Sequence, residues 1–351
     1  MAQRIVIMAG GTGGHVFPAL AVAHYLREQG WQVTWLGTQQ GLESRVIPEQ
    51  GIEIDWLSVA GVRGKGFFAK FTAAFMVLKA CAQACSILRR RQPHVVLGMG
   101  GFVAGPGGLM AKLLGIPLVI HEQNKVPGTT NRLLAKMTRN VLAAFEGSFN
   151  PTVKAQYTGN PLRKELTHLA KKEAWQGVRQ CRVLIIGGSQ GAAILNTTVP
   201  AALAQLPEVA IRHQTGRAML TEVEQQYQQL GVSAEVSDFI YDMRAAYEWA
   251  DIIICRAGAM TISEVAAAGL PAILIPLPNA IDDHQVANAR VLADAGGAII
   301  LLQQNLNSSN LLRDIKQVQD NSVIMSNNAQ KVARLDATQQ VANICIARAK
   351  P

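Results

Sequence analysis

A loose internal repeat is the feature that most constrains the fold of this chain. In residues 5–15 an apolar stretch, IVIMA, runs into a Gly-rich turn, GGTGGH, and then into the apolar-periodic residues 18–26. The same order returns half a chain later, where residues 183–191 read VLIIGGSQG and precede the helical pattern of residues 192–206. A buried strand, a Gly-rich turn and a helix, repeated in this way, predict two doubly wound, Rossmann-like α/β domains.

Short apolar strands alternate with helical segments along the rest of the chain. The further strands expected are residues 33–36, 95–97, 118–121, 141–143, 252–255 and 272–276. Pro and Gly in GNP, residues 159–161, predict a boundary between a domain of residues 1–160 and one of residues 161–335, which we expect to open with a polar helix over residues 163–176. Because parallel sheets bind ligands beyond the carboxyl ends of their strands, we expect the functional site at the Gly-rich turns.

The positive charge of the chain is confined to its first half. The 351 residues carry a net charge of +9, and residues 1–160 hold 16 Lys and Arg against 7 Asp and Glu, whereas residues 161–351 hold 17 of each kind. This division predicts an anionic partner for the first domain, which is a phospholipid surface, a phosphorylated ligand or nucleic acid. Nucleic acid is the weakest of the three, because aromatic residues make up only 5% of the chain and no RRM, KH, zinc-finger or basic-zipper signature occurs.

Cysteine usage and the first residues indicate a cytoplasmic protein. The five cysteines are an odd number and form no C-x-x-C pair, so we expect reduced thiols rather than a disulfide framework or a zinc module. The apolar residues 5–9 lead straight into the Gly-rich turn, which is the pattern of a strand and not of a secretory leader.

The first Gly-rich turn, residues 10–15, has the form of an anion site. It follows a strand and opens a helix, so backbone N–H groups and the helix dipole favour a phosphate there; a tight turn without a ligand is the alternative. Val16 stands where a G-x-G-x-x-G motif needs its last Gly, and no Lys follows as in a P-loop. Residues 33–36 are followed by GTQ and not by an acid, which argues against a dinucleotide-dependent enzyme.

Two further groups in the first half are candidates for chemistry. His15 lies in the first turn of its helix, where the dipole disfavours the protonated imidazole, so it is a candidate general base; a capping role is the alternative. His121, Glu122, Gln123 and Asn124 follow one another at a strand end. Four polar groups in a row are poor core material, so we expect them at the site, with a hydrogen-bonded turn as the alternative.

The second half repeats the anion-site pattern. Residues 187–191, GGSQG, place the hydroxyl of Ser189 beside a helix start, and Arg163 lies near the expected boundary, where its guanidinium could pair with a phosphate. The segment RAGAMTISE, residues 256–264, runs from a strand end into a short helix, where Glu264 could accept hydrogen bonds from two sugar hydroxyls. The adjacent acids of the following DDHQ segment form no D-x-D pair, so we expect no bound divalent metal.

Residues 67–91 predict a basic helix with two apolar sides. One side collects Phe68, Phe71, Phe75, Leu78, Ala82 and Cys85, whereas Phe67, Met76 and Val77 lie off it. The cations around the helix are Lys65, Lys70, Lys79, Arg89, Arg90 and Arg91. Two apolar sides need two partners, which we expect to be the domain core and an anionic membrane surface; a helix buried on both sides is the alternative.

Taken together, the motifs resemble the MurG family of glycosyltransferases. In order they are GGTGGH, GxRGKG, HEQN, GNPxR, GGSQGA, RxGAxTxSE and DDHQxxNA, within residues 5–295. The resemblance implies a GT-B architecture, in which two Rossmann-like domains face a deep cleft, and an inverting N-acetylglucosaminyltransferase of peptidoglycan synthesis. Members of this family move GlcNAc from UDP-GlcNAc to the C4 hydroxyl of the muramoyl-pentapeptide sugar of lipid I, an undecaprenyl pyrophosphate, and so form lipid II.

The resemblance also implies a donor site without a metal or other cofactor. Its residues would be Thr12, Gly13, Gly14, Asn124, Arg163, Ser189, Ile240, Ala259, Met260, Thr261, Ile262, Ser263, Glu264 and Gln285. Arg163 and Ser189 would contact the phosphates of UDP-GlcNAc, and Glu264 its ribose. The backbone at Ile240 would contact uracil, and Gln285 the GlcNAc hydroxyls.

The catalytic base and the acceptor side would belong to the first domain. His15 and Glu122 are both candidates for the base. The acceptor and the membrane would be met by Arg63, Lys65, Phe68, Phe71, Phe75 and Lys79, and residues 336–351 would form a helix that packs back on this domain. The implied partners are UDP-GlcNAc, lipid I, an anionic phospholipid surface at the cytoplasmic face of the inner membrane, and other proteins of cell-wall synthesis and division.

Two alternative functions stay open at this point. A UDP-GlcNAc 2-epimerase of the same architecture would release UDP and free sugar and would need no lipid. A non-catalytic membrane scaffold that binds UDP-GlcNAc as a sensor would bind the donor without turnover. Residues 303–334 carry no motif that we can assign.

Overall fold

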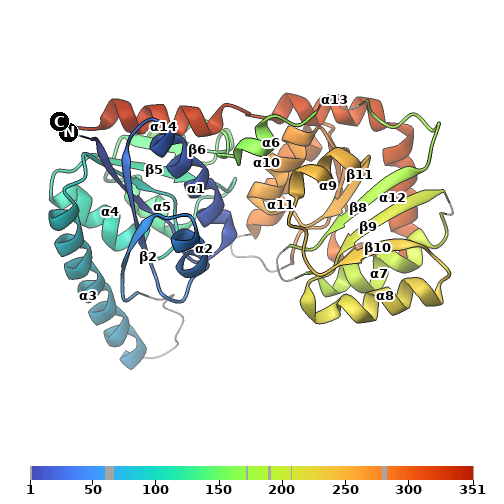
Figure 1. Cartoon of the computed structure of the whole chain (residues 1–351), viewed down its shortest axis with the longest axis horizontal. Coiled ribbons are helices and arrows are strands. Elements are labelled where there is room, and N and C mark those ends of the chain that lie inside the picture. The colour runs from blue at the N-terminus through green and yellow to red at the C-terminus, as the bar shows by residue number, and fades with distance from the viewer. Residues whose placement is uncertain are drawn as a thin grey trace. The chain divides into compact units, whose positions relative to one another are not determined.

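The computed structural model describes residues 2–59, 67–170, 173–188, 191–206, 208–278 and 283–350, with residues 67–73 described by their backbone alone. The chain divides into two compact units (Figure 1). Unit 1 contains residues 1–163 and 335–351, and unit 2 contains residues 164–334. Each unit is built on one parallel sheet, which confirms the two Rossmann-like domains predicted from the repeat.

The sheet of unit 1 contains seven strands within the described residues. From edge to edge they are β3 (Glu53–Trp56), β2 (Gln32–Gly37), β1 (Arg4–Met8), β4 (Val95–Gly98), β5 (Leu118–Glu122), β6 (Asn140–Ala143) and β7 (Gln156–Tyr157). The helices of unit 1 are α1 (Gly13–Glu28), α2 (Glu43–Glu49), α3 (Phe67–Arg91), α4 (Ala104–Leu113), α5 (Thr129–Leu134) and α14 (Ala337–Arg348), with a 3-10 turn at Pro151–Val153.

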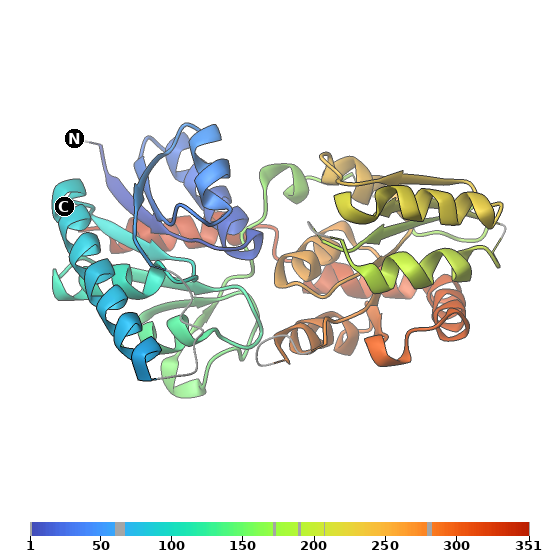
Figure 2. The ribbon, with the colours of Figure 1, turned by 90° about the horizontal axis from the view of Figure 1, so that it is seen from below.

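Both faces of this sheet are buried under helices (Figure 2). Ile5 and Ile7 of β1 pack into a core shared with α1 and α14, and Val6 and Met8 pack on the opposite face with α3 and α4. A strand that is apolar on both faces is typical of a parallel sheet, and this explains the unbroken apolar run that the sequence shows. Val341 and Cys345 of α14 are fully buried against the first of these cores.

Unit 2 repeats the architecture with six strands in its described part. In sheet order they are β10 (Ala234–Ser237), β9 (Val209–Gln214), β8 (Cys181–Ile186), β11 (Ile252–Cys255), β12 (Ala272–Leu274) and β13 (Ala298–Ile300). The helices are α6 (Lys164–Thr167), α7 (Ala193–Leu203), α8 (Leu220–Gln229), α9 (Met243–Trp249), α10 (Ala259–Ala268), α11 (His284–Asp294), α12 (Ser308–Asp320) and α13 (Ser322–Val332), with 3-10 turns at Arg217–Met219 and Gln303–Asn305.

The helices α12 and α13 occupy most of the segment to which the sequence assigned no motif. Leu311, Ile315 and Val318 of α12 are fully buried and share a core with α7 and β8. These side chains recur at intervals of three and four residues, which places them on one helical face. The segment is therefore structural cover for the sheet of unit 2.

The Gly-rich turns lie where the strand order of each sheet reverses. In unit 1 the chain builds β2 and β3 on one side of β1 and β4 on the other, and in unit 2 the same reversal separates β8 from β11. Doubly wound sheets bind ligands at this switch point, beyond the carboxyl ends of the strands. The turns after β1 and β8 therefore lie at the position that the fold provides for a ligand.

Two secondary-structure predictions are wrong. Residues 163–176 do not form one long helix. Of those that the structure describes, only Lys164–Thr167 is helical, and the N–H of Ala170 donates to the carboxylate of Glu248. Five strands were not predicted, namely β3, β7, β9, β10 and β13. Four of these, β3, β7, β10 and β13, are edge strands, where an apolar pattern is not required. The fifth, β9, lies next to the edge strand β10 and carries Arg212, His213 and Gln214.

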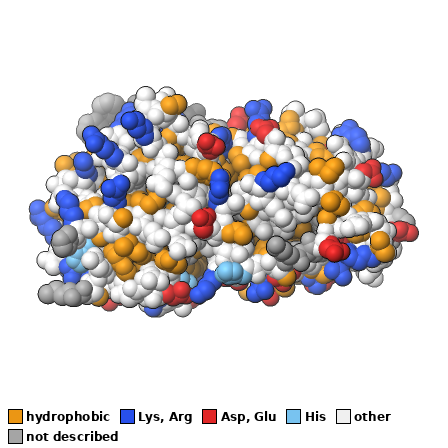
Figure 3. Space-filling view, turned by 90° about the horizontal axis from the view of Figure 1, so that it is seen from above, with side chains coloured by type: hydrophobic (Ala, Val, Ile, Leu, Met, Phe, Trp, Pro, Cys, Tyr) orange, Lys and Arg blue, Asp and Glu red, His pale blue; other side chains and the backbone are white. Residues whose placement is uncertain are grey.

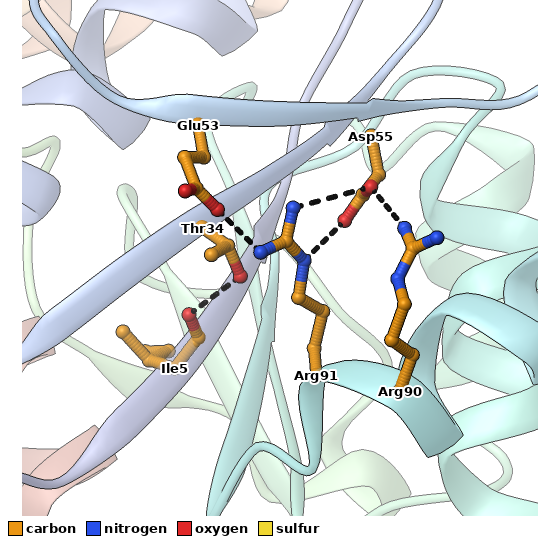
Figure 4. A network of polar contacts seen from close by, with 6 residues as sticks. All are labelled: Ile5, Thr34, Glu53, Asp55, Arg90 and Arg91. Atoms are coloured by element: carbon orange, nitrogen blue, oxygen red, sulfur yellow. Dashed lines mark hydrogen bonds and ion pairs between the residues drawn. The ribbon is translucent and has the colours of Figure 1, made fainter.

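An ion-pair network fixes the carboxyl end of α3 to β3 (Figure 4). Asp55 accepts hydrogen bonds from Arg90 at 2.5 Å and from Arg91 at 2.7 Å, and Arg91 also pairs with Glu53. The hydrogen bond that Arg91 donates to Asp55 raises the pKa of Arg91. These two arginines, which the sequence grouped with the cations of a membrane-facing helix, therefore hold α3 against the sheet.

Candidate active site

The first Gly-rich turn, which joins β1 to α1, makes a close backbone contact with the loop after β4. Gly11 has a φ of +93°, and a Cβ atom at Gly101 would lie 2.4 Å from the carbonyl oxygen of Gly10. The loop that follows β4 can approach the turn this closely only because Gly101 lacks a side chain. Thr12 precedes α1 without a side-chain capping hydrogen bond, and the backbone of Gly13 and Gly14 forms the first turn of the helix.

A buried carboxylate is hydrogen-bonded to this turn. Glu43, in the first turn of α2, is 0% exposed. Its Oε2 atom accepts a 2.9 Å hydrogen bond from the N–H of Gly11, and its Oε1 atom accepts from the N–H of Thr38 at 2.9 Å and from its hydroxyl at 2.8 Å. An acid is therefore present at the end of β2, although the sequence near that strand end suggested none.

Glu43 argues against a phosphate at the first turn. The N–H of Gly11 already donates to the carboxylate, and a second anion in the same loop would be repelled by it. The phosphate site expected from the loop pattern alone is therefore not supported here. A neutral ligand group, such as a sugar hydroxyl, fits the polarity of this loop better.

His15 is linked to the motif at the end of β5. The imidazole lies partly buried in the first turn of α1, and its Nδ1 atom is 2.9 Å from Oε1 of Gln123. A Cβ atom at Gly100, which has a φ of +94°, would come within 2.9 Å of the imidazole Cε1. The glycine after β4 therefore leaves room for the Nδ1–Cε1 edge of the ring.

The polar motif after β5 is buried, which corrects the expectation that it is poor core material. His121, Glu122 and Gln123 are at most 2% exposed. Glu122 accepts hydrogen bonds from the N–H of Asn124 at 2.9 Å, from the N–H of Gly128 at 3.0 Å and from the side chain of Asn131 at 2.9 Å, with a further bond of 3.2 Å from the side chain of Asn124. Both carboxylate oxygens are thus engaged in folding the loop, which meets the requirement that a buried charge be hydrogen-bonded.

Arg163 lies over an aromatic ring at the end of unit 1. Its guanidinium carbon is 5.8 Å from the centre of the Phe17 ring, and Phe17 is 37% exposed on the first turns of α1. A guanidinium over the face of an aromatic ring is attracted to the ring's π electrons. Of the other expected phosphate ligand, Ser189, nothing is described, because residues 189–190 lie outside the described part of the chain.

The described part of the second Gly-rich turn is fixed by contacts with the end of β9. Gly188 and Gly191 have φ values of +93° and +73°, and a Cβ atom at Gly191 would lie 1.8 Å from the carbonyl oxygen of Thr215. The same carbonyl accepts a 3.0 Å hydrogen bond from Asn196 of α7. Only glycine fits at position 191, so the turn approaches its neighbour by backbone alone.

The helix α10 carries the expected donor residues 259–264. It begins at Ala259 after Gly258, without a side-chain cap. Ile262 is fully buried, so any contribution that it makes to ligand binding has to come from its backbone. The hydroxyl of Ser263 donates to the carbonyl of Ala259 at 3.0 Å, and Met260 and Thr261 are partly exposed in the first turn.

Glu264 and Gln285 are both held in place by neighbours in unit 2. The hydroxyl of the buried Tyr247 donates to Glu264 at 2.8 Å. The Oε1 atom of Gln285 accepts from the N–H of Leu277 at 2.9 Å, so the donor end of this amide is the part that can face a ligand. Burial lowers the pKa of Arg256, whose guanidinium donates to the carbonyl of Ile275 at 3.1 Å.

Two exposed aromatic side chains flank Ile240. Phe239 is 44% exposed and Tyr241 is 86% exposed, and their rings meet edge to face with centres 5.0 Å apart. Ile240 stands between them in the sequence and is partly buried in the loop that follows β10. Exposed rings in a loop at a strand end are well suited to contact a planar base.

The exposed side of α3 carries apolar and basic residues together. Phe75 is 72% exposed and Leu78 is 68% exposed, and Lys79 follows them, whereas Ala80 and Ala84 face the core. A cavity of about 660 Å³ opens beside this stretch. It is lined by Thr38, Gln39, Gln40, Trp56, Leu57, Ser58, Val59, Phe75, Met76, Lys79 and Gln83. Arg63 and Lys65 lie outside the described residues, as do the side chains of Phe68, Lys70 and Phe71.

The charge of the two units differs in sign. Unit 1 carries 19 Lys and Arg against 8 Asp and Glu, and unit 2 carries 14 against 16. On the face that Figure 3 draws, Lys and Arg side chains gather over unit 1 with few acids among them. The basic half expected from the sequence therefore corresponds to unit 1.

Two features are absent from the described residues. Among these residues no group of three or more His, Cys, Asp or Glu side chains is placed to hold a metal ion. No helix in the same part of the chain is both long enough and apolar enough to cross a membrane.

Comparison with known proteins places these features in a family. Residues 5–143 match the glycosyltransferase family 28 N-terminal domain, and residues 182–347 match the C-terminal domain of the same family. The chain belongs to glycosyltransferase family 28. The two family 28 domains contain the turns after β1 and β8, so both halves of the candidate site lie in matched sequence.

Relatives in family 28 match the chain over almost its whole length. The UDP-N-acetylglucosamine-N-acetylmuramyl-(pentapeptide) pyrophosphoryl-undecaprenol N-acetylglucosamine transferase of Methylococcus capsulatus is 56% identical over 99% of both chains. A protein of the same description from Shewanella halifaxensis is 49% identical over 98% of this chain and 96% of its own.

Solved structures agree with this family assignment. The crystal structure of MurG from Acinetobacter baumannii shares 39% identity and a TM-score of 0.85, with 98% of this chain and 99% of that chain covered. A UDP-GlcNAc 2-epimerase from Neisseria meningitidis has a TM-score of 0.67 at 13% identity, with 98% of this chain and 100% of that chain covered, and so shares the fold. The GT-B architecture expected from the motifs is thereby confirmed.

Two residues that organise the site, Glu43 and Tyr247, were not predicted from the sequence, and neither was the role of a third, Gln123. Glu43 and Tyr247 lie far in sequence from the motifs that they contact, and only the fold brings them there. Gln123 lies inside the predicted HEQN motif, but a neutral amide gives no sign of acid or base chemistry, so the sequence did not predict a role for it. A signal was available for Glu43, which is an acid a few residues beyond the end of β2, where Rossmann folds carry one.

Proposed function

We propose that this chain transfers N-acetylglucosamine from UDP-GlcNAc to the C4 hydroxyl of the muramoyl-pentapeptide sugar of an undecaprenyl-pyrophosphate acceptor. The observation that carries the proposal is the 56% identity over 99% of both chains with a relative that bears this activity in its name. The product is the disaccharide-linked lipid of peptidoglycan synthesis. Inversion at the anomeric carbon follows from a single displacement, in which the acceptor oxygen forms the new bond as the bond to UDP breaks.

Unit 2 is the proposed donor side. Ser189, the backbone of the second Gly-rich turn and, from unit 1, Arg163 would contact the diphosphate, since a Cβ atom at Gly188 would meet no described atom within 4 Å and the backbone there is open to a ligand. Glu264 would hold the ribose, and Gln285 the GlcNAc hydroxyls. The tight contact of Tyr247 supports this role for Glu264, because it fixes one carboxylate oxygen and so orients the other.

Further donor contacts would come from short backbone segments. The loop at Ile240 would face uracil, with the exposed rings of Phe239 and Tyr241 beside it. The first turns of α10 would run along the nucleotide, through Ala259, Met260, Thr261, Ile262 and Ser263. From unit 1, Thr12, Gly13, Gly14 and Asn124 would meet the transferred sugar, in keeping with a first turn whose polarity favours neutral groups.

His15 is the proposed catalytic base. Its ring lies in the first turn of α1 and is partly exposed. Glu122, the other candidate, is 2% exposed and accepts four hydrogen bonds, from Asn124, Gly128 and Asn131. Removing a proton from a substrate would require Glu122 to give up those bonds, so the geometry favours His15.

The proposed transfer step is a single displacement. The acceptor C4 hydroxyl gives its proton to His15 Nε2, and its oxygen attacks the anomeric carbon of GlcNAc. The bond between that carbon and the diphosphate oxygen breaks, and the electron pair leaves with UDP. Arg163 and the backbone N–H groups of the second turn would stabilise the charge that develops on the diphosphate.

The exposed side of α3 is the proposed contact with an anionic membrane surface at the cytoplasmic face. Phe75 and Leu78 expose apolar area beside Lys79, and unit 1 as a whole is basic. Each cation near anionic lipid contributes about 1 kcal/mol to binding. Arg63, Lys65, Phe68 and Phe71 would extend this surface toward the start of the helix.

The test is a transfer assay with radiolabelled UDP-GlcNAc and a lipid I analogue, with UDP release followed in parallel with and without the acceptor. We expect labelled disaccharide-lipid to form only when the acceptor is present. UDP and free sugar released without acceptor would overturn the proposal in favour of the epimerase. Donor binding without any turnover would overturn it in favour of a sensor.

A further inference from the structure

A chain of four polar groups connects the backbone of Gly159 to the ring of His15. His121 Nε2 lies 2.9 Å from the carbonyl oxygen of Gly159, and His121 Nδ1 lies 3.2 Å from Nε2 of Gln123. The other end of the Gln123 amide, Oε1, lies 2.9 Å from Nδ1 of His15. Because each member can only donate or only accept at a given atom, the direction of every bond can be worked out from the carbonyl.

The first link fixes His121. A carbonyl oxygen accepts and cannot donate, so the hydrogen lies on His121 Nε2. The residue is 0% exposed, and burial lowers the pKa of His121 to about 4, against smaller raising contributions from Gly159 and Glu122. His121 is therefore neutral near pH 7, and its Nδ1 atom carries a lone pair and acts as an acceptor.

The second link fixes the amide of Gln123. One end of the side chain faces two acceptors, His121 Nδ1 and the carbonyl oxygen of His121, each at 3.2 Å. Only the NH2 end can donate to both, whereas a flipped amide would place its oxygen against two lone pairs. The oxygen of Gln123 therefore faces His15, and because Gln123 is 1% exposed, water is not available to rescue the flipped form.

We propose that Gln123 and His121 are positioning residues that hold His15 with its proton on Nδ1 and its lone pair on Nε2. The amide oxygen of Gln123 accepts from Nδ1–H, so the neutral ring has its basic nitrogen at the opposite corner. Gly100 leaves room for the ring in this position, because a Cβ atom there would lie 2.9 Å from Cε1 and 3.0 Å from Nδ1. The inference rests on the proposed role of His15, because only a base at Nε2 needs this tautomer.

The arrangement also explains why a neutral amide is suited to this position. When Nε2 takes a proton from the acceptor hydroxyl, the ring becomes an imidazolium, and the hydrogen bond from Nδ1 to Gln123 becomes charge-assisted and stronger. The amide gives this stabilisation without placing a charge beside the first Gly-rich turn, where Glu43 already supplies one. The role resembles that of the residue that orients a catalytic histidine in hydrolases, with an amide in place of a carboxylate.

The direct test is nitrogen NMR of the full chain labelled in its histidine rings, near pH 7. The signals of His15 are assigned by their loss in His15→Asn. We expect the wild-type ring to be protonated at Nδ1 and unprotonated at Nε2. A ring protonated at Nε2, or a mixture of the two tautomers, would overturn the proposal without any variant being needed.

A variant then links the tautomer to turnover. Gln123→Met keeps the volume of the side chain and removes its hydrogen bonds, and Gln29→Met on the exposed end of α1 is the matched control. We expect Gln123→Met to give a mixed tautomer and to lower kcat roughly 10- to 100-fold, with the KM for UDP-GlcNAc unchanged. The control should match the wild type in both measurements, and thermal melting reports whether either variant is folded.

The role of His15 as the base and the positioning role of Gln123 and His121 can be overturned separately. A wild-type ring protonated at Nδ1, together with full turnover in both Gln123→Met and His15→Ala, would remove His15 as the base and with it the functional meaning of the tautomer. A wild-type ring protonated at Nε2, together with lost turnover in His15→Ala, would keep His15 as the base and overturn the positioning role of Gln123 and His121.

Discussion

The carboxylate of Glu43 accepts a 2.9 Å hydrogen bond from the backbone N–H of Gly11, and this contact ties the start of α2 to the turn after β1. The other oxygen of Glu43 accepts from both the N–H and the hydroxyl of Thr38 at the end of β2. A single buried side chain thus connects two strand ends at the switch point of unit 1. It also sets the electrostatic character of the loop, because it leaves a negative charge where many Rossmann folds bind a phosphate.

Replacing Glu43 should destabilise unit 1. In Glu43→Gln the NH2 end of the amide has to face a backbone donor at one of the two strand ends, so at least one buried hydrogen bond is lost. We expect the free energy of unfolding to fall by about 1–3 kcal/mol, measured by urea denaturation. Glu49→Gln, on the exposed end of the same helix, is the control and should be near neutral. Equal stabilities of the two variants would contradict the role given to Glu43.

His15→Ala should lose turnover while it retains donor binding. General base catalysis contributes typically 10²- to 10⁴-fold, so we expect kcat to fall by roughly that factor. Calorimetry with UDP-GlcNAc should give a dissociation constant close to that of the wild type, since the donor contacts lie mainly in unit 2. His24→Ala, on the exposed side of the same helix, controls for changes to α1. Unchanged turnover in His15→Ala would remove His15 from the role of base.

Glu264 and Tyr247 should act together on donor affinity. Hydrogen bonds to a charged group contribute about 1.5–3 kcal/mol, so Glu264→Gln should raise the KM for UDP-GlcNAc by roughly 10-fold or more with a smaller effect on kcat. Tyr247→Phe removes only the bond that orients the carboxylate and should raise the same KM by a smaller factor. Glu222→Gln, on the exposed side of α8, is the control. A KM that does not change in Glu264→Gln would exclude the ribose contact.

The sequence was sufficient to predict the architecture because the signals are local. Strand, Gly-rich turn and helix follow one another directly around Gly11 and again around Gly188, and each turn also requires a positive φ that glycine tolerates. The α/β class and the parallel sheets follow from that pattern. The edge strands were missed because a strand such as β10, with the sequence AEVS, is exposed enough to carry polar residues.

The candidate site was only partly predictable, because its supporting contacts join residues that are distant in sequence. His15 and the HEQN motif were recognised separately, but 108 residues separate His15 from Gln123, and no pattern in the sequence indicates that their side chains meet. The burial of Glu122 was missed for the same reason. Asn131 and Gly128, which supply its hydrogen bonds, come from the turn and helix that follow.

Unit 2 should lose stability in acid through His213. This residue is 1% exposed, accepts from the hydroxyl of Tyr227 at 3.0 Å and donates to Asn196 at 3.2 Å, and burial lowers the pKa of His213 to about 3. The unfolded chain binds a proton at this residue below about pH 6.5, whereas the native state does not until about pH 3. The contribution is therefore fully present above pH 6.5 and is lost as the pH falls, at about 1.4 kcal/mol per pH unit.

The measurement is urea unfolding followed by tryptophan fluorescence between pH 7.5 and pH 5. His213→Gln should be less stable than the wild type at pH 7.5 but should lose less stability on acidification. His168→Gln, at an exposed position of unit 2, should keep the wild-type dependence on pH. A wild-type slope retained in His213→Gln would show that the acid sensitivity of the chain comes from other groups.

Phe75 and Leu78 should govern binding to anionic vesicles. Burying such a side chain contributes about 1.5–3 kcal/mol, so the double variant Phe75→Ser, Leu78→Ser should lower partitioning into phosphatidylglycerol-containing vesicles by 10-fold or more. Ile324→Ser, which removes a 62% exposed apolar side chain from α13 of unit 2, is the matched control and should bind as the wild type does. Added salt should weaken the binding of the double variant and of the control, because it screens Lys79 and the other cations of unit 1. Equal binding of the double variant and the control would mean that the exposed side of α3 does not meet the membrane, and transfer to a water-soluble acceptor should be unchanged in either case.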